Sequence, residues 1–117
     1  MAEAPYRWYW RRHRTSSGGD PVGEFLRELP SENRRALTLA TQLMRENGVR
    51  GARHLRGDLY EVRAQTAQAH YRLIFSQESR TVLLALIAYD KNTEKTPRRM
   101  VELAQRRLAD WRERGKP

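Results

Sequence analysis

The sequence contains no cysteine, so disulfide bonds and thiolate metal ligands are excluded. A chain without cysteine suits a reducing compartment, and we expect the protein to be cytoplasmic. Histidine is rare as well: three are present, and none has a partner at the spacing of an HxH or HExxH motif, so no metal site and no cofactor are predicted. No apolar run approaches the roughly 20 residues that cross a bilayer. Arginines interrupt the aromatic cluster near the N-terminus, which argues against a signal sequence.

Lysine is scarce although the chain is strongly basic. It occurs only at Lys91, Lys95 and Lys116, and the formal net charge is nevertheless +9 because arginine supplies the other basic residues. Such a surplus attracts polyanions, of which nucleic acid is the commonest in a cytoplasm. An acidic protein would be attracted by the same charge, and the surplus also favours solubility. Lysine differs from arginine in that its pKa shifts readily, which draws attention to Lys91 and Lys95.

The N-terminal half predicts a strand followed by a helical hairpin. The length of 117 residues fits one compact domain, residues 1–117. Residues 6–12 are rich in aromatic residues and read as a strand, whose Trp-Tyr-Trp centre we assign to packing. Asp20 is expected to cap a short helix with Pro21 at its first position.

Ser31 is expected to cap a second helix that closes at Asn47-Gly48. Its predicted apolar face consists of Ala36, Leu39, Ala40, Leu43 and Met44.

The C-terminal half predicts three strands and a helix. Residues 59–63 and 71–75 alternate with a period of two, and residues 81–89 are apolar enough for a central strand. Thr96 and Pro97 then read as the N-cap and first position of a last helix. The fold class is therefore α+β: an N-terminal strand and helical hairpin, then a curled antiparallel sheet and a C-terminal helix. We expect helices mainly on one face, with the other face open to a ligand.

Four segments, in order, carry a resemblance to a known family. They are PVGEFL at residues 21–26, LRGDLYEVR at 55–63, HYRLIF at 70–75 and KNTEKTP at 91–97. Together they resemble phage Gp49-like and HigB-type proteins of the RelE/ParE toxin superfamily, over roughly residues 6–112. The resemblance implies a RelE-like fold.

The resemblance also implies a function. Such proteins are toxins of type II toxin–antitoxin pairs, which usually cut mRNA in the ribosomal decoding site without a metal ion. A cognate helix-turn-helix antitoxin holds them inactive. The superfamily also contains gyrase-directed ParE-type toxins and members without demonstrated activity, so a non-catalytic nucleic-acid or ribosome binder is an alternative.

Arg63 and Arg72 are the candidates for clamping the scissile phosphate. They lie on neighbouring predicted strands, each opposite the apolar face of its strand, and a guanidinium binds phosphate oxygens through two parallel hydrogen bonds. The alternative is that both are exposed strand arginines paired with Glu61 or Asp58.

Residues 89–95 supply the other catalytic candidates. Tyr89 would stack on a base or move a proton, and Lys91 and Lys95 would stabilise the transition state. Asp90 stands where many relatives carry a second basic residue. It would act as a general base or simply neutralise Lys91.

His54 is the remaining catalytic candidate, because its pKa lies close to neutrality; the alternative is an ordinary surface histidine. Four arginines complete the predicted site as RNA-binding residues, or as contacts for an acidic antitoxin: Arg53, Arg56, Arg98 and Arg99.

Overall fold

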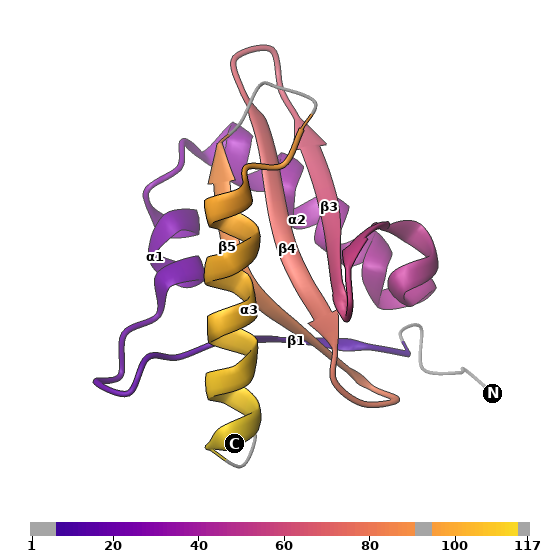
Figure 1. Ribbon diagram of the computed structural model, residues 1–117. Helices are drawn as coiled ribbons and strands as arrows, with labels where there is room; N and C mark the ends of the chain where they lie inside the picture. Colours follow the sequence, from indigo (N-terminus) through magenta and orange to yellow (C-terminus); the bar gives the residue numbers. More distant parts are fainter. Residues whose placement is uncertain (1–6, 91–94, 115–117) are drawn as a thin grey trace, which may run out of the picture.

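The computed structural model describes residues 7–90 and 95–114 (Figure 1). Lys91, predicted to be catalytic, lies outside the described residues. The elements in chain order are β1 (Tyr9–Arg12), α1 (Pro21–Arg27), α2 (Ser31–Asn47), a 3-10 turn η1 (Gly48–Gly51), β2 (Arg53–Arg56), β3 (Leu59–Gln65), β4 (His70–Gln77), β5 (Val82–Asp90) and α3 (Arg98–Glu113). No helix within these ranges is long and apolar enough to cross a membrane.

The predicted α+β, RelE-like arrangement is confirmed. The strands form one five-stranded sheet in the order β1-β5-β4-β3-β2. The strands from β2 to β5 pair antiparallel, whereas β1 pairs parallel with β5 at the edge of the sheet. The parallel pair is possible because the helical hairpin and three strands separate β1 from β5 in the sequence.

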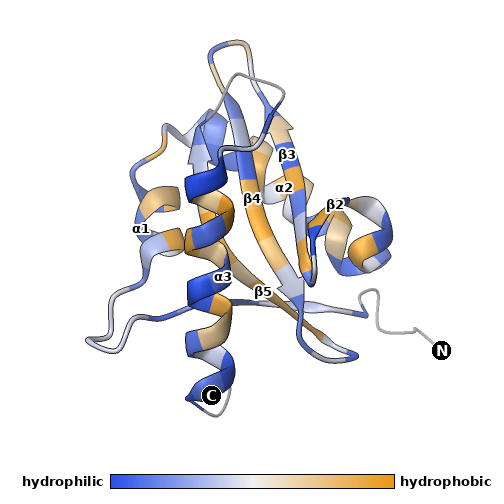
Figure 2. Cartoon of the chain, viewed as in Figure 1, coloured by the Kyte–Doolittle hydropathy of each residue, from blue (hydrophilic) through white to orange (hydrophobic). Residues whose placement is uncertain are grey.

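Helices cover both faces of the sheet, so the expectation of one open face was wrong. On one face, Leu59, Ile74 and Leu86 pack against α3. On the other face, Val62, Leu73 and other apolar residues pack against α1 and α2. Figure 1 shows α3 lying across the sheet with α2 behind it, and Figure 2 shows the strongly apolar centre of the sheet between them. Successive residues of β4 and β5 are both apolar, as expected for strands buried on two sides.

The buried face of α2 also differs from the prediction. Leu37 and Met44 are fully buried, whereas Leu39 and Leu43 are 57% and 55% exposed. The buried polar residue on this helix is Asn33, whose amide donates to the Tyr71 hydroxyl at 2.7 Å. The buried face of α2 is therefore rotated by part of a turn from the predicted one, and it carries Leu37, Met44 and the hydrogen bond from Asn33 to Tyr71.

Trp8 and Trp10 pack as predicted, whereas Tyr9 between them is 50% exposed. The Trp10 ring meets Phe75 edge to face, with ring centroids 5.1 Å apart, and its indole N–H donates to the Thr41 carbonyl at 2.8 Å. The Trp8 ring lies against Gly48, which ends α2 with a φ of 59°. A side chain at position 48 would collide with this ring, since a Cβ there would lie 2.8 Å from the Trp8 indole.

Of the three predicted N-terminal helix caps, only Asp20 is present as such. Asp20 accepts a hydrogen bond from the Gly23 backbone N–H at 3.2 Å, and Pro21 follows as the first helical residue. Ser31 and Thr96 make no capping hydrogen bond: α2 begins directly after Pro30, and α3 begins after Pro97. The Thr96 hydroxyl is engaged elsewhere, as described below.

Asp20 should stabilise the fold in a pH-dependent way. A hydrogen bond from Arg12, the largest effect, lowers the pKa of this buried carboxyl. Its contribution is therefore present above the unfolded pKa of about 3.9 and is lost as the pH falls through the lower folded pKa. We expect Asp20→Ala to reduce the free energy of unfolding by about 1–2 kcal/mol at pH 7, measured by urea denaturation.

The matched variant is Asp20→Asn, which keeps a capping oxygen without the charge. It should retain the cap and lose the pH-dependent part of the stability that Asp20 contributes. If the free energy of unfolding fell equally with decreasing pH in the wild type and in Asp20→Asn, Asp20 would not be the source of the pH dependence.

Candidate active site

Three predicted site residues form a row across three strands. Arg63 of β3 lies directly opposite Arg72 of β4, and Arg72 lies directly opposite Tyr89 of β5. Residues paired in this way point to the same face of an antiparallel sheet, with their Cβ atoms about 5 Å apart. The register therefore brings these three side chains together on the face that α3 covers.

A buried carboxylate organises this row. Glu61 is 1% exposed. It accepts from Arg63 Nε at 3.0 Å and from the Thr96 hydroxyl at 2.6 Å, and Arg72 lies 3.5 Å away. Arg72 also donates to the Thr96 hydroxyl at 3.3 Å. Because Thr96 precedes α3, the cluster ties the start of that helix to the sheet.

The two arginines differ in exposure, which separates what each can do. The Arg72 side chain is 5% exposed, whereas that of Arg63 is 41% exposed. A buried carboxylate is tolerated only with a paired positive charge and satisfied hydrogen bonds. Arg72 supplies the buried positive charge. Arg63 reaches the surface. The pairing of both arginines with Glu61, left open by the sequence, is present; Asp58 pairs with Arg112 instead, at 3.0 Å.

Tyr89 forms the inner end of the row. It is 7% exposed, and its hydroxyl is buried without a hydrogen-bond partner of good geometry in the described residues. Burial raises the pKa of the Tyr89 phenol, and the charge of Glu61 raises it further, while Arg72 and Thr96 oppose the shift. The phenol is therefore protonated at neutral pH, so it can donate a proton and cannot accept one. Its burial leaves no room for a base to stack on it.

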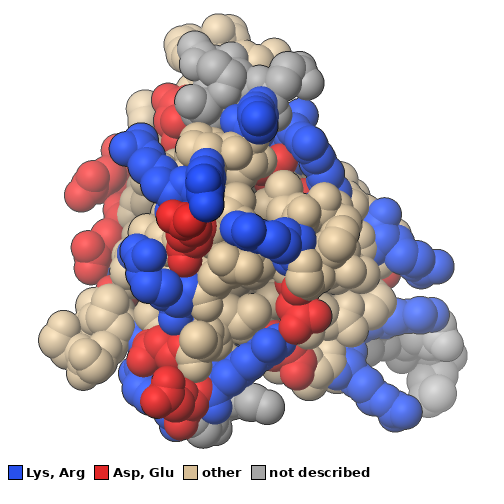
Figure 3. Space-filling model, in the orientation of Figure 1, with Lys and Arg blue, Asp and Glu red and all other residues tan. Residues whose placement is uncertain are grey.

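A basic cleft adjoins the cluster. It has a volume of about 220 Å³ and is lined by Arg53, Leu55, Arg56, Lys95, Thr96, Arg98 and Val101. Four of the predicted site residues, three arginines and Lys95, therefore share one depression. Thr96 belongs to both the cleft and the Glu61 cluster, so the two are contiguous. In Figure 3, basic side chains are prominent over the upper part of this face, with acidic ones among and below them.

Other predicted residues lie apart from this region. His54 pairs with Tyr60, so it points to the opposite face from Glu61, and its ring nitrogen lies 2.8 Å from the Gly57 carbonyl. Asp90 is paired with Tyr71 and points to that same opposite face. Arg99 is exposed on the first turn of α3 and does not line the cleft. No cluster of metal-binding side chains was found within residues 7–90 and 95–114.

Glu61 and Thr96 are the residues whose importance the sequence did not reveal. The sequence predicts Thr96 only as a helix cap and Glu61 only as an alternative partner for arginine. One signal was present: Glu61 shares its strand face with Leu59, which is a core position, and Arg63 follows at the next place on that face. A carboxylate placed between a core position and an arginine marks a buried ion pair.

The comparison with known proteins decides the family. The family described as "Phage derived protein Gp49-like" matches residues 24–109. The chain belongs to this family. Two curated relatives are each 33% identical to this Gp49-like protein over 108 residues, which cover 88% of this chain and 84% of theirs. Both are named "Probable endoribonuclease HigB1" and come from Mycobacterium tuberculosis, strains CDC 1551 / Oshkosh and ATCC 25618 / H37Rv. The predicted relationship to Gp49-like and HigB-type proteins is confirmed.

Removal of the buried carboxylate should destabilise this Gp49-like protein strongly. Glu61→Ala leaves Arg72 buried without its carboxylate, and breaking a buried pair in this way costs roughly 3–5 kcal/mol. The measurement is the free energy of unfolding from urea titration at pH 7.

Asp58→Ala is the matched control for Glu61→Ala, because Asp58 is also a carboxylate paired with an arginine but its side chain is 64% exposed. It should change stability by less than about 1 kcal/mol. Equal effects of the two variants would show that Glu61 does not organise the site.

Proposed function

We propose that this Gp49-like protein is the toxin of a type II toxin–antitoxin pair and acts as an endoribonuclease. In this proposal it works in the cytoplasm on mRNA in the ribosomal decoding site, without a metal ion, and a helix-turn-helix antitoxin holds it inactive. The observation that carries the proposal is the surface-reaching guanidinium of Arg63 beside a cleft lined by Lys95 and three further arginines. The naming of the relatives as probable endoribonucleases supports the same reaction class.

Metal-free cleavage of RNA requires the 2′-hydroxyl to attack the adjacent phosphorus. The bond from O2′ to phosphorus forms while the bond from phosphorus to O5′ breaks, the 2′-hydroxyl loses its proton and O5′ gains one. The products are a 2′,3′-cyclic phosphate and a 5′-hydroxyl. The phosphate carries additional negative charge in the transition state, and preorganised positive groups stabilise it.

Arg63 is the group that we assign to the scissile phosphate. Its Nε is held by Glu61, which fixes the plane of the guanidinium, and a guanidinium fixed in this way binds an anion with little loss of side-chain freedom. Arg72 is assigned a positioning role, because it is buried and neutralises Glu61 beneath Arg63. Without Arg72, Arg63 alone would balance the charge of Glu61, and its attraction for a phosphate would be weaker.

The cleft residues supply the remaining electrostatic stabilisation. We assign Lys95, which lines the cleft, to the developing charge at phosphorus, and Arg53, Arg56 and Arg98 to neighbouring phosphates of the RNA. Tyr89 is protonated and buried below this surface, and we assign it to the floor of the site.

Replacement of Arg63 should abolish toxicity without unfolding the protein. Arg63→Gln is expected to lower the rate of ribosome-dependent mRNA cleavage about 100-fold or more, the loss typical of one preorganised anion-binding donor. Its partly exposed position predicts only a small change in stability. The measurements are growth after induction in bacteria without an antitoxin, mapping of transcript ends, and cleavage by purified protein on programmed ribosomes.

The matched control is Arg35→Gln, an exposed arginine on α2, which should cleave as the wild type does. Retained RNA binding with lost cleavage in Arg63→Gln would support the enzyme. Unimpaired growth with intact transcripts when the wild-type chain is induced would contradict it, and so would DNA damage signalling with undamaged mRNA, which would indicate a gyrase-directed toxin.

A further inference from the structure

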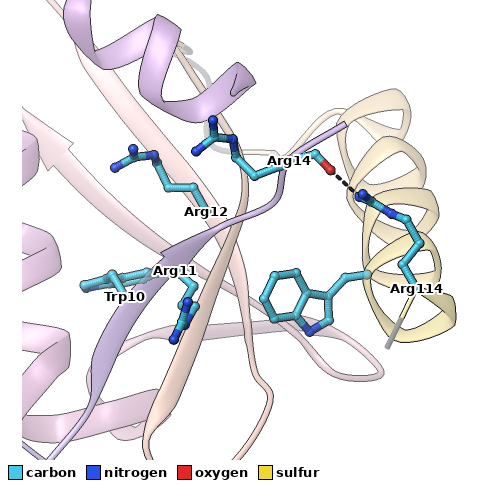
Figure 4. Close-up of a pocket in the computed structure, with 6 residues that line it drawn as sticks. Trp10, Arg11, Arg12, Arg14 and Arg114 are labelled. Atoms are coloured by element: carbon cyan, nitrogen blue, oxygen red, sulfur yellow. Dashed lines mark hydrogen bonds between the residues drawn. The ribbon is translucent and has the colours of Figure 1, made fainter. Parts of the chain in front are cut away.

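A second basic pocket lies at the opposite end of the molecule from the Glu61 cluster. It lies between β1 and the C-terminal end of α3, has a volume of about 400 Å³, and is lined by Trp10, Arg11, Arg12, Arg14, Trp111 and Arg114 (Figure 4). All six residues lie outside the segment that the Gp49-like family match covers. The rise along α3 places Trp111 about 20 Å from Arg98 of the first cleft.

Two of the four arginines are fixed in the walls of the pocket. Arg12 pairs with Asp20 at 3.0 Å. Arg114 pairs with Asp110 at 2.6 Å and also donates to the backbone carbonyl of Arg14, a contact drawn in Figure 4. These interactions hold the guanidinium groups in place, so little conformational entropy remains to be lost when an anion enters.

The other two arginines carry the positive charge that is not compensated. Arg11 and Arg14 are exposed, and neither side chain forms an ion pair or hydrogen bond to any residue in the described ranges. Because the pocket thus combines four guanidinium groups with two carboxylates, it has a surplus of positive charge. Arginine binds the oxygens of phosphate through its planar fork, and clustered arginines with aromatic side chains are typical of surfaces that bind nucleic acid.

A buried donor in the pocket wall also lacks an acceptor. Trp111 is 6% exposed, and its indole N–H has no hydrogen-bond partner in the part of the chain that the structure describes. An unsatisfied buried N–H is destabilising, and native proteins rarely leave one without a reason. The Trp111 side chain lines the pocket, so a ligand seated there would contact it while its N–H stays buried. Trp10 differs, because its N–H is already bonded to Thr41.

We propose that this pocket is a second RNA-binding site, which holds backbone phosphates at a distance from the cleavage site. The inference rests on the proposed function, because the RNA that would bind in this pocket is the RNA that the enzyme acts on or docks against. Arg11 and Arg14 bind the phosphate oxygens, Arg12 and Arg114 add fixed positive charge, and the Trp111 side chain forms part of the pocket wall. An RNA of several nucleotides bridges the two sites.

The test is the salt dependence of binding to an RNA that cannot be cleaved. The double variant Arg11→Gln/Arg14→Gln is compared with Arg35→Gln/Arg80→Gln, which removes the same charge from exposed positions elsewhere. Binding of a labelled 2′-O-methyl RNA of about twelve nucleotides, about three times the shortest single-strand site size, is followed by fluorescence anisotropy over a range of salt concentrations. The pocket variant should bind about tenfold more weakly, and its slope of log K against log salt should fall by about 1.4, because each phosphate contact contributes about 0.7. The control should keep the wild-type slope.

A second measurement locates the RNA. The indole N–H resonance of Trp111, assigned with Trp111→Phe, should shift when the RNA is added to the wild-type protein and should not shift in the pocket variant. Equal weakening in both double variants would overturn the proposal in favour of diffuse charge. Weaker binding of polyglutamate with unchanged RNA binding would overturn it in favour of a protein partner.

The proposed function fails or stands separately from this second site. A chain that binds the uncleavable RNA through the pocket but cuts no mRNA keeps the second site and loses the enzyme. A chain that cuts mRNA and binds RNA equally well without Arg11 and Arg14 keeps the enzyme and loses the second site.

Discussion

The interaction on which the site depends is the burial of one carboxylate among positive charges. Glu61 is stable beneath α3 because Arg72 pairs with it at depth while Arg63 and Thr96 donate hydrogen bonds to it, since an isolated charge at that depth would cost many kcal/mol. Each of these partners comes from a different part of the chain. The requirement to satisfy Glu61 therefore fixes the register of β3 against β4 and the position at which α3 begins.

The same requirement determines what the surface presents. A pair of adjacent arginines on one sheet face would repel each other, and Glu61 removes most of that repulsion. The Arg72 guanidinium is buried beside Glu61, whereas that of Arg63 extends toward solvent. A site built in this way has a rigid cation at its surface without an exposed counter-ion beside it, which is the arrangement that favours recognition of a phosphate over recognition of water.

Much of the fold was predictable because its signals are local. Asp20-Pro21, Asn47-Gly48 and the alternating strands each depend on a few neighbouring residues, and all three are present in the structure. The face of α2, the second helix layer and the role of Thr96 depended on contacts between distant segments. Periodicity predicts that one side of a helix is buried, but it does not show that Asn33 bonds to Tyr71 or that the buried side is rotated by part of a turn.

The candidate site was predictable to a similar extent. The resemblance gave the residue types, and strand alternation placed Arg63 and Arg72 on one face, but neither gave their depth. Their unequal burial follows from α3, whose path across the sheet is a tertiary feature. His54 lies outside the strands that the sequence predicts, whereas in the structure it belongs to the short strand β2, whose pairing with Tyr60 turns it to the face opposite Glu61.

The parallel pairing of β1 with β5 has a consequence for synthesis on the ribosome. Tyr9 is translated before its partner Val82, which lies 73 residues further along the sequence. At about 5–20 residues per second, β1 waits several seconds before it can enter the sheet. During that interval β1 is an unpaired, arginine-rich aromatic segment of the nascent chain. The Glu61 cluster likewise cannot assemble until Thr96 has been translated, 35 residues after Glu61.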